Sequence, residues 1–371
     1  MHVTLIGPTH PYKGGVAQHT TTLAHELTTA GHDVDLVSWS AQYPSKLYPG
    51  VQRVEEPEIP VFPRTRYPLA WFRPDSWWRL GRSLRRTGGL LVFVLVTPVQ
   101  IPAYLVMLAA LGRRRNGERP TTAVICHNVL PHETKPGDRQ LVRALLARTD
   151  VALVHSDTEA QLARDHGARD VRTCELPTFG PAARSVPTRG KGGNGLLFFG
   201  FIRPYKGVEV LLRAVARVPG VRLRVAGESW NGEEALRGLV TELGLADRVD
   251  LRLTYLPDDE LDRLLGAADA LVVPYLSGTG TQHVRVAQRH GLPVIASRIS
   301  TIPDQVDDGV DGLLVRPGDV DDLADAISRL YEPGRLEQLR SAVLAPDPAA
   351  LWRPYVALLT GVPEPTAPSV A

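Results

Sequence analysis

The sequence predicts an α/β fold in which two doubly wound domains follow one another along the chain. Short apolar strands alternate with helical segments throughout, and most strands lack the alternating polarity of a half-exposed sheet, which indicates parallel sheets covered on both faces. The 371 residues also exceed the usual size of one hydrophobic core. One stretch rich in glycine and proline, residues 181–195, separates two such series and predicts an interdomain linker.

The first series, residues 1–180, begins with an expected strand at Val3–Gly7, a loop at His10–Gly15 and a helix at Val16–Ala30. Gly31 ends this helix, and an expected strand at Asp33–Trp39 completes a βαβ unit. The pattern repeats downstream, with expected strands at Ala123–Asn128 and Val151–Ser156 and expected helices at Gly137–Arg148 and Asp157–His166.

The second series occupies residues 196–345, and residues 346–371 follow it as a C-terminal helix and tail. The expected strands are Leu196–Gly200, Val221–Gly227, Val249–Leu253, Ala270–Pro274 and Pro293–Ser297. The expected helices are Val208–Val218, Glu233–Leu243, Asp258–Ala268, Thr281–His290 and Asp319–Tyr331, with one more at Pro348–Leu359. Because ligands of such sheets bind beyond the carboxyl ends of the strands, a shared ligand is expected in a cleft between the two domains.

The composition, with 43% apolar and 22% charged residues, is typical of folded soluble proteins. Two cysteines cannot supply a disulfide framework, and the start MHVTLIGPTH lacks the features of a secretory signal, so we expect a cytoplasmic protein. The segment Leu90–Leu111 is 22 residues without a charge, long enough to span a bilayer. Two prolines, Pro98 and Pro102, interrupt it, and we favour a strand at Leu91–Val96 and an amphipathic helix at Val99–Leu111 over a spanning helix.

The segment Phe198–Gly207, FFGFIRPYKG, is the most informative about function. An apolar strand ends at a glycine there, and Arg203 and Lys206 come just before a helix. The first N–H groups of a helix have no partner inside it, the helix dipole adds partial positive charge, and a lysine adds a full one. The segment therefore predicts a phosphate site for a nucleotide-activated or phosphorylated ligand. The alternative is that both side chains are solvated loop charges.

Several motifs occur together in one order. They are Gly14-Gly15-Val16 after the first strand, RPYKG, VAGE at Val225–Glu228, AADALVVPY at Ala267–Tyr275, GLPVIAS at Gly291–Ser297 and DGVDGLLVRPGD at Asp308–Asp319. With them the chain resembles, over nearly its whole length, the GT-B-fold glycosyltransferases of the retaining family 4 (glycosyl transferases group 1). The resemblance implies two Rossmann-like domains facing across a cleft, the N-terminal one for the acceptor and the C-terminal one for a nucleotide-sugar donor.

The resemblance also implies residue roles. In the family a lysine and a nearby arginine neutralise the donor's diphosphate, which is the leaving group; Lys206 matches the lysine, and Arg203 is expected to replace the usual arginine, since Phe201 stands at its position. His127 matches a histidine often kept beside the donor sugar, although a histidine at a strand end is more often structural. Further donor contacts are implied at Gly14, Gly15, Gly200, Gly227, Tyr275, Gly278, Thr279, Gly280 and Thr281, and acceptor contacts at His10 and Asn128. Thr281 is also a candidate helix N-cap.

The chain departs from the family at two positions. Typical members carry two glutamates eight positions apart, and alignment back from GLPVIAS places Gly278 and Val286 there. A branch of the family has a segment rich in serine, threonine and glycine instead, which PYLSGTGTQHVRVAQ resembles. The missing acids leave an alternative function, a catalytically inactive sugar-nucleotide-binding partner of another enzyme.

Residues 64–119 form a basic segment in which eleven arginines face two acidic residues. The arginines are Arg64, Arg66, Arg73, Arg79, Arg82, Arg85, Arg86, Arg113, Arg114, Arg115 and Arg119, the acids are Asp75 and Glu118, and the interleaved aromatic residues are Trp71, Phe72, Trp77 and Trp78. Arginine with tryptophan suits the anionic surface of a membrane, so we hypothesise peripheral attachment to the inner leaflet and a lipid-linked or membrane-borne acceptor. The alternative is a solvated basic face with tryptophans packed on the sheet, and nucleic acid is disfavoured because no recognition module occurs.

Together these observations predict a retaining glycosyltransferase, independent of metal and cofactor, that uses a nucleotide-diphosphate-sugar and a sugar, lipid-linked or small-molecule acceptor. No Asp/Glu pair stands out as nucleophile and acid. The mechanism proposed for the family needs none, because the departing phosphate takes the acceptor proton on the same face.

Overall fold

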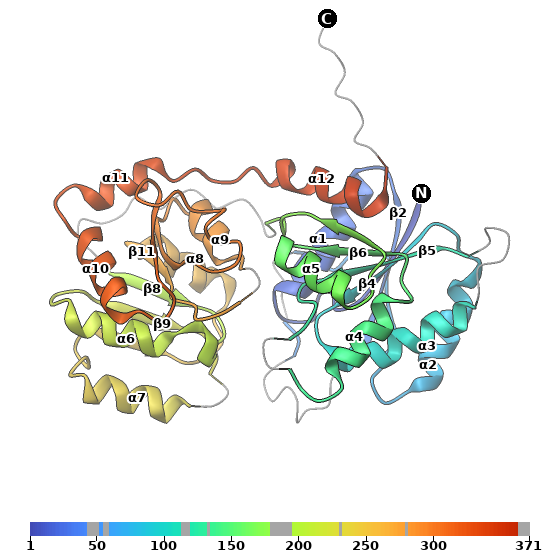
Figure 1. The fold of residues 1–371 in the computed structure, drawn as a ribbon, viewed down its shortest axis with the longest axis horizontal. Helices are drawn as coiled ribbons and strands as arrows, with labels where there is room; N and C mark the ends of the chain where they lie inside the picture. The colour runs from blue at the N-terminus through green and yellow to red at the C-terminus, as the bar shows by residue number, and fades with distance from the viewer. Residues whose placement is uncertain are drawn as a thin grey trace, which may run out of the picture. The chain divides into compact units, whose positions relative to one another are not determined.

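The structure is a computed structural model that describes residues 1–42, 52–54, 59–112, 119–131, 134–178, 195–229, 232–278 and 281–362. The chain divides into two compact units. Figure 1 colours the chain by residue number, so the segments of each unit can be followed from the N-terminus to the C-terminus. Unit 1 consists of Met1–Pro181 with Asp347–Ala371, and unit 2 of Ala182–Pro346.

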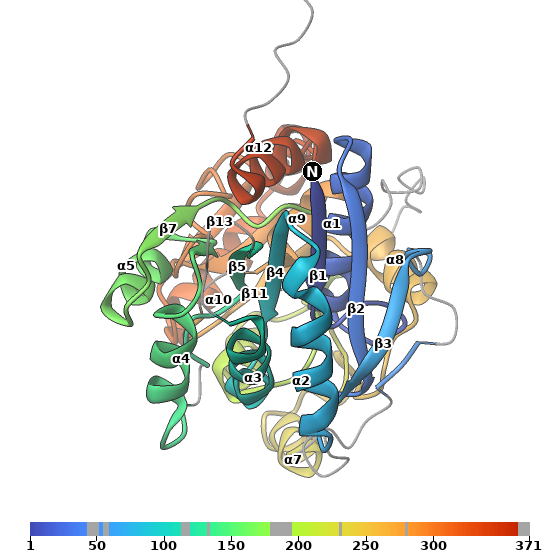
Figure 2. The same ribbon diagram turned by 90° about the vertical axis from the view of Figure 1, so that its right-hand side faces the viewer.

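Within the described residues, unit 1 contains a seven-stranded parallel sheet in the order β3-β2-β1-β4-β5-β6-β7 (Figure 2). The strands are β1 (His2–Ile6), β2 (Asp33–Ala41), β3 (Thr65–Ala70), β4 (Leu90–Leu95), β5 (Thr121–Cys126), β6 (Val151–Val154) and β7 (Asp170–Thr173). The helices are α1 (Gly15–Thr29), α2 (Pro74–Ser83), α3 (Ile101–Leu111), α4 (Asp138–Leu146), α5 (Asp157–Asp165) and α12 (Pro348–Thr360).

Strand β4 shows that this sheet is covered on both faces, since all of its residues are buried. Leu91 and Phe93 join the core that includes residues of α3, whereas Leu90 and Val92 join the core that includes residues of α1 and α12. Successive side chains of a strand point to opposite faces, so a continuous apolar run is the pattern of a strand buried on both sides.

Helix α12 belongs to unit 1 although it follows unit 2 in the sequence, and it packs beside α1 (Figure 1). Its Trp352 is 2% exposed, and Nε1 of this residue donates a hydrogen bond to the carbonyl of Thr178 over 2.8 Å. The sequence pattern predicts the helix but not its place in the fold.

Within the described residues, unit 2 contains a six-stranded parallel sheet in the order β10-β9-β8-β11-β12-β13. The strands are β8 (Leu196–Phe199), β9 (Leu223–Ala226), β10 (Val249–Arg252), β11 (Ala270–Val273), β12 (Val294–Ser297) and β13 (Gly312–Val315). The helices are α6 (Val208–Arg217), α7 (Glu233–Glu242), α8 (Asp258–Ala267), α9 (His283–Arg289), α10 (Val320–Leu330) and α11 (Arg335–Ala342).

Strand order reverses between two central strands in each sheet, between β1 and β4 in unit 1 and between β8 and β11 in unit 2. Loops that leave the carboxyl ends of such a pair diverge, and ligands of doubly wound sheets bind there. A ligand site in unit 2 is therefore expected at the segments after β8 and β11.

The predicted fold class, two doubly wound α/β domains, is confirmed. The uncharged segment Leu90–Leu111 is β4, a short 3-10 turn at Pro98–Gln100 and α3. Among the helices of the described residues, none has the length and apolar character needed to cross a membrane. Five elements were not predicted, namely β3, α2, β7, β13 and α11. The predicted linker lies outside the described residues except for Gly195.

Candidate functional site

The chain leaves β8 through Gly200 and a 3-10 turn at Pro204–Lys206 before it enters α6. Lys206 ends this turn and is only 6% exposed. The next residue, Gly207, has a φ of +69°, and a Cβ there would lie 2.1 Å from the carbonyl oxygen of Pro274. Glycine is therefore required at position 207, and the turn that it makes holds Lys206 against the segment after β11.

Three segments of unit 2 converge on the Lys206 ammonium group. Nζ of Lys206 lies 5.4 Å from the centre of the Tyr275 ring. A Cβ built on Gly200 would lie 3.2 Å from this Nζ and 2.8 Å from Nε2 of His283, so both nitrogens face the bare side of Gly200. Gly200, Lys206, Tyr275 and His283 are named the unit 2 cradle.

Gly227, directly after β9, packs against the backbone of the cradle residue Gly200. Its φ is +145°, and a Cβ there would lie 2.2 Å from the carbonyl oxygen of Gly200. The N–H of Gly200 in turn donates to the carbonyl of Ala226 over 2.9 Å. The two glycines thus let the strand ends approach closely, and this contact positions the backbone that borders Lys206.

The charge of Lys206 has no counter-charge in the described part of the chain, where no carboxylate forms an ion pair with it. Burial, and then the neighbouring Arg203, lower the pKa of Lys206 to about 8, so the ammonium form still predominates at pH 7. A buried cation without an anion is unfavourable by itself, and an anionic ligand would relieve it. The cradle is therefore suited to bind an anion.

His283, the first residue of α9, is a cradle residue that the sequence did not reveal. Its Nδ1 lies 2.6 Å from the Thr281 hydroxyl and 3.2 Å from the Tyr275 hydroxyl. Its Nε2 is buried and makes no hydrogen bond to the described residues. The available signal was a histidine in the segment where the chain departs from the family pattern, but nothing in the sequence indicates where the ring points.

The other predicted donor residues of unit 2 differ in their burial and in their neighbours. Arg203 is half-buried, and its carbonyl accepts a hydrogen bond from the N–H of Lys206 over 2.9 Å. Tyr275 is buried, and burial raises the pKa of its hydroxyl. Gly278 has a φ of +157°, and the nearest atom to a Cβ there would be the Ile299 Cδ1 at 3.8 Å. Thr279 and Gly280 lie outside the described residues.

The alternative role of Thr281 as N-cap is corrected by one residue, because α9 starts later than predicted. Gln282 occupies the N-cap position, and α9 begins at His283 rather than at Thr281. The Thr281 hydroxyl nevertheless accepts the N–H of His283 over 3.2 Å, which is the bond that a cap makes. The same hydroxyl contacts the His283 ring, so it orients this side chain as well as the helix start.

In unit 1, His127 directly follows β5 and packs in a cluster of histidines. Its ring centre lies 4.8 Å from that of His19 and 5.3 Å from that of His155. Trp352 and Tyr355 of α12 stack on His19 and His155, with ring centres 5.3 Å and 5.8 Å apart. These five residues are named the histidine cluster.

The histidine cluster is electrically neutral near pH 7. Burial lowers the pKa of His155 to about 4, and burial together with the neighbouring histidines lowers the pKa of His19 and His127 well below the usual value. Nε2 of His127, Nε2 of His155 and the Tyr355 hydroxyl are buried without a hydrogen bond to the described residues. The cluster can therefore offer uncharged polar atoms but no fixed cation.

The loop that carries His127 and Asn128 is held by a hydrogen bond to Glu159, a residue that the sequence patterns did not indicate. Glu159 of α5 is buried and accepts the N–H of Val129 through its carboxylate. Burial raises the pKa of this carboxyl group. The side chain of Asn128 is half-buried in this loop.

The remaining predicted residues of unit 1 are His10 and Gly14, before α1, and Gly15, its first residue. Gly14 is the N-cap of α1 with a φ of +108°, and a Cβ there would meet no atom within 4 Å, so its backbone faces open space. Gly15 is exposed. His10 is buried; its Nδ1 donates to the carbonyl of Ile59 over 2.7 Å, and its own carbonyl accepts the Tyr67 hydroxyl over 2.8 Å.

The basic segment combines paired and unpaired arginines. Among the described residues, Arg64 pairs with Asp33 and Asp35, and both Arg73 and Arg79 pair with Asp75. The exposed arginines without an ion pair to a described residue are Arg66, Arg82, Arg85 and Arg86. Trp71, Phe72 and Trp78 are 41%, 59% and 45% exposed, whereas Trp77 is half-buried and donates to the carbonyl of Ala70. Residues 113–118 of the segment lie outside the described residues.

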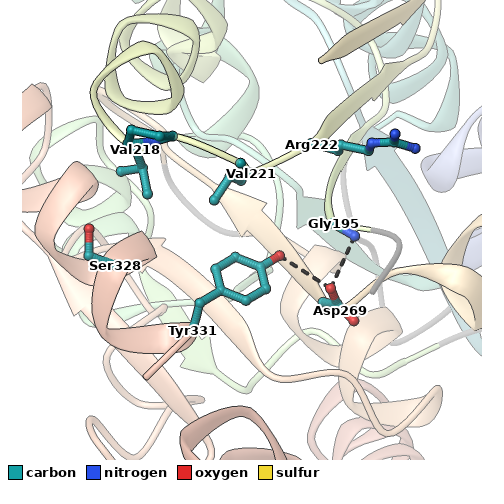
Figure 3. A pocket seen from close by; sticks show the side chains of 9 residues that line it. Gly195, Val218, Val221, Arg222, Asp269, Ser328 and Tyr331 are labelled. Atoms are coloured by element: carbon teal, nitrogen blue, oxygen red, sulfur yellow. Dashed lines mark hydrogen bonds between the residues drawn. The ribbon is translucent and has the colours of Figure 1, made fainter. Parts of the chain in front are cut away.

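Unit 2 also contains a pocket of about 500 Å³, shown from close by in Figure 3. Its residues Gly195, Arg222 and Asp269 come just before β8, β9 and β11, whereas the cradle residues follow β8 and β11, so the pocket lies at the other end of the sheet. The Asp269 carboxylate accepts the N–H of Gly195 over 3.0 Å and the Tyr331 hydroxyl over 3.3 Å. These bonds tie the strand starts to α10, which indicates a structural role, and ligands of such sheets bind at the opposite ends.

The described residues contain no group of three or more His, Cys, Asp or Glu side chains placed to hold a metal ion. Cys126 and Cys174 are free, and Cys126 is buried.

Comparison with known proteins matches both units to glycosyltransferase family models. Residues 193–333 match the family model described as glycosyl transferases group 1, and residues 13–178 match the one described as Glycosyltransferase Family 4. The D-inositol 3-phosphate glycosyltransferase of Mycolicibacterium smegmatis is 35% identical over 222 residues, which is 54% of this chain and 49% of that protein. The chain thus spans about half the length of the curated relatives that it matches.

Several solved structures match 97% of this chain. The HepE protein of Anabaena in complex with UDP has a TM-score of 0.70 at 17% identity, over 97% of this chain and 98% of that one. Sucrose-phosphate synthase from Thermosynechococcus elongatus has a TM-score of 0.70 at 21% identity, with the same coverage. At these identities the likeness shows the fold, which is GT-B. With both family models matched in order along the chain, the protein belongs to the family 4 (group 1) glycosyltransferases.

Proposed function

We propose that this chain is a retaining glycosyltransferase that transfers a sugar from a nucleotide-diphosphate-sugar donor without a metal ion. The observation that carries the proposal is the buried ammonium of Lys206, which faces a bare glycine backbone and has no carboxylate partner in the described residues. A diphosphate leaving group develops negative charge as the glycosidic bond breaks, and a fixed cation stabilises that charge more in the transition state than in the ground state.

Further support comes from proteins that the chain resembles. The mycobacterial relatives are named D-inositol 3-phosphate glycosyltransferases, and the Anabaena structure contains UDP. We propose Lys206 and Arg203 as the cations at the diphosphate, Gly200 as the backbone that lets the diphosphate approach, and His127 as the residue beside the donor sugar. Gly227 contributes by letting its own backbone pack against Gly200. Retention would follow if the departing phosphate takes the acceptor proton on the face that it leaves.

The first experiment measures thermal stabilisation of the parent protein by UDP-, GDP- and dTDP-sugars. A ligand present at about 100 times its dissociation constant stabilises the folded protein by about 2.7 kcal/mol, which is easily seen in a melting curve. We expect one nucleotide class to stabilise the parent. If none of them does, the donor assignment is wrong.

The variant Lys206→Met removes the charge and keeps the buried stem of the side chain. Loss of one such electrostatic contact lowers turnover by about 100-fold or more, and we expect the donor-induced stabilisation to fall with it. Because a buried unpaired cation is removed, the variant should fold at least as stably as the parent. Lys135→Met, at an exposed lysine, is the matched control and should behave like the parent.

The alternative of an inactive sugar-nucleotide binder is favoured by Gly278 and Val286 at the usual glutamate positions. It predicts donor binding without transfer or donor hydrolysis in the parent protein. Where transfer occurs, the anomeric configuration of the product, measured by NMR, tests retention, and unchanged activity in EDTA tests metal independence.

For the acceptor we propose a membrane-borne molecule, reached by peripheral attachment at the inner leaflet through the basic segment. The support is the exposure of Trp71, Phe72 and Trp78 on the same segment as four arginines that form no ion pair with a described residue, which the packed-tryptophan alternative does not explain. Each basic residue near an acidic membrane surface contributes about 1 kcal/mol. The mycobacterial relatives' name favours a second candidate, a soluble phosphorylated polyol.

Vesicle binding separates the two acceptor candidates. We expect the protein to cosediment with vesicles of acidic phospholipid at low salt and not with neutral vesicles. The double variant Arg82→Glu/Arg85→Glu should abolish this, whereas Arg139→Glu, on the exposed side of α4, should not. Absence of binding to acidic vesicles would leave the soluble acceptor.

A further inference from the structure

His283 is the cradle residue for which the proposed diphosphate site has no assigned role. It lies at the start of α9, and its ring packs 4.5 Å, centre to centre, from Phe199 at the end of β8. Its Nε2 is directed at the bare side of Gly200, as is Nζ of Lys206. The two nitrogens are therefore close enough for the oxygens of one phosphate group to contact both.

Two hydroxyl groups contact the other side of the ring. The Thr281 hydroxyl accepts the backbone N–H of His283 and lies 2.6 Å from Nδ1, so its own proton is free to point at Nδ1. The Tyr275 hydroxyl, also a donor, lies 3.2 Å from Nδ1. When these hydroxyls donate to Nδ1, the proton of a neutral imidazole sits on Nε2, and we take this tautomer for His283.

The ring is held neutral by its surroundings. Burial, and then the charge of Lys206, lower the pKa of His283 well below its usual value. A neutral ring protonated at Nε2 presents one N–H donor to the cradle. No hydrogen bond of normal geometry to the described residues engages this buried donor, although the ring also interacts with the Phe199 backbone, and a buried donor without a good acceptor costs free energy unless a ligand accepts from it.

We propose that Nε2–H of His283 donates a hydrogen bond to a phosphate oxygen of the donor's diphosphate, next to the Lys206 ammonium, with Thr281 orienting the ring. The proposal rests on the proposed function. Lys206 then supplies charge and His283 supplies direction: the ammonium can rotate, whereas the imidazole N–H is fixed by the hydroxyl behind it. His283 would thus select a diphosphate placed at one position over other anions.

The test compares binding of UDP, GDP and dTDP with that of the corresponding monophosphates by titration calorimetry. His283→Ala should weaken the diphosphate that the parent binds by about 10-fold, the effect of one hydrogen bond to a charged group, and weaken the monophosphate less. His283→Gln, whose amide can place an N–H near the Nε2 position, should recover most of the loss. Thr281→Val should weaken diphosphate binding less than His283→Ala, because the donor remains but loses its orientation.

The outcomes separate this proposal from the function on which it rests. If the parent binds a nucleoside diphosphate and Lys206→Met loses it while His283→Ala keeps parent affinity, the role of His283 is wrong and the donor site stands. If His283→Ala and His283→Gln lose affinity equally for diphosphate and monophosphate, with lowered melting temperatures, His283 is only a packing residue. If the parent binds none of the three diphosphates, the proposed function itself fails.

Discussion

Each unit brings histidine rings close to the carboxyl ends of its parallel strands but surrounds them differently: His127 and His155 directly follow β5 and β6 in unit 1, whereas His283 reaches Gly200, directly after β8, from the start of α9 in unit 2. In unit 1 three histidine rings pack against one another and against Trp352 and Tyr355. In unit 2 a single ring, His283, faces Lys206 and is held by two hydroxyl groups. A histidine at a strand end therefore says little about function until its neighbours are known.

The difference in neighbours implies a difference in ligand. The histidine cluster has polar atoms without partners in the described residues, but no cation, so it can accept or donate hydrogen bonds to an uncharged group such as a sugar hydroxyl. The unit 2 cradle has a similar unbonded nitrogen together with a full positive charge, which suits phosphate. Under the proposed function, the positive charge is therefore concentrated where the diphosphate leaving group binds.

Acidification should give the largest effect, because it lowers the unfolding free energy through the histidine cluster. The folded-state pKa of His155, about 4, lies below the unfolded value of about 6.5, so its contribution to stability is complete above pH 6.5 and is lost as the pH falls towards 4. For His155 alone this amounts to roughly 2 kcal/mol between pH 7.5 and 5 and about 3 kcal/mol below pH 4. His19 and His127 shift in the same direction.

Urea unfolding at pH 7.5 and pH 5 measures this loss. His19, His127 and His283 contribute with the same sign, so the variant His155→Asn, whose side chain does not titrate, isolates the His155 contribution. We expect the variant to show a shallower pH dependence than the parent. An unchanged slope would mean that the cluster does not titrate as a buried group.

His127→Ala tests whether the cluster is more than packing. If His127 contacts the donor sugar, kcat should fall by about 100-fold, the typical effect of one positioned donor, while the affinity for the nucleoside diphosphate stays at the parent value because its contacts lie in unit 2. The matched control is His166→Ala, at a half-buried histidine that ends α5 and hydrogen-bonds the Leu162 carbonyl. Equal small losses in both variants would assign His127 to packing.

The elements that the sequence predicts are those whose burial leaves a local pattern. β4 is a run of six apolar residues because both of its faces are covered, and Gly31 and Gly207 mark turns that side chains cannot make. The edge strands β3 and β7 were missed because their residues are largely half-exposed and polar. The return of α12 to unit 1 depends on tertiary packing, which leaves no local pattern.

The same distinction applies to the candidate site, where some residues leave a local sequence pattern and others do not. Lys206 was predictable because its charge stands in a distinctive strand-to-helix junction. His19 was not, because it lies in a run of polar residues on α1 that look solvent-facing. Thr20 and Thr21 beside it are buried and satisfied by hydrogen bonds to carbonyls four residues earlier, each over 2.8 Å, so the polar run is compatible with burial.

The smallest expected effect gives the sharpest test of the unit 2 cradle, because a matched control separates its two causes. Gly200→Ala places a methyl group beside Nζ of Lys206 and Nε2 of His283 and also forces alanine to a φ of +102°. Gly220→Ala forces a similar conformation, φ +79°, where a Cβ meets nothing within 4 Å. Both variants should lose about 1 kcal/mol of unfolding free energy through backbone strain, and Gly200→Ala more than Gly220→Ala, because its Cβ would lie only 2.8 Å from Nε2 of His283.

Only Gly200→Ala should also weaken binding of the nucleoside diphosphate, by about 10-fold, because only there does the new methyl group displace phosphate from the two nitrogens. Calorimetric titration beside a melting curve for each variant measures both quantities. Equal affinity in the two variants would show that the bare side of Gly200 is not where the anion sits. The unit 2 cradle would then be a buried polar contact like the histidine cluster, and the contrast between the units would reduce to the charge of Lys206.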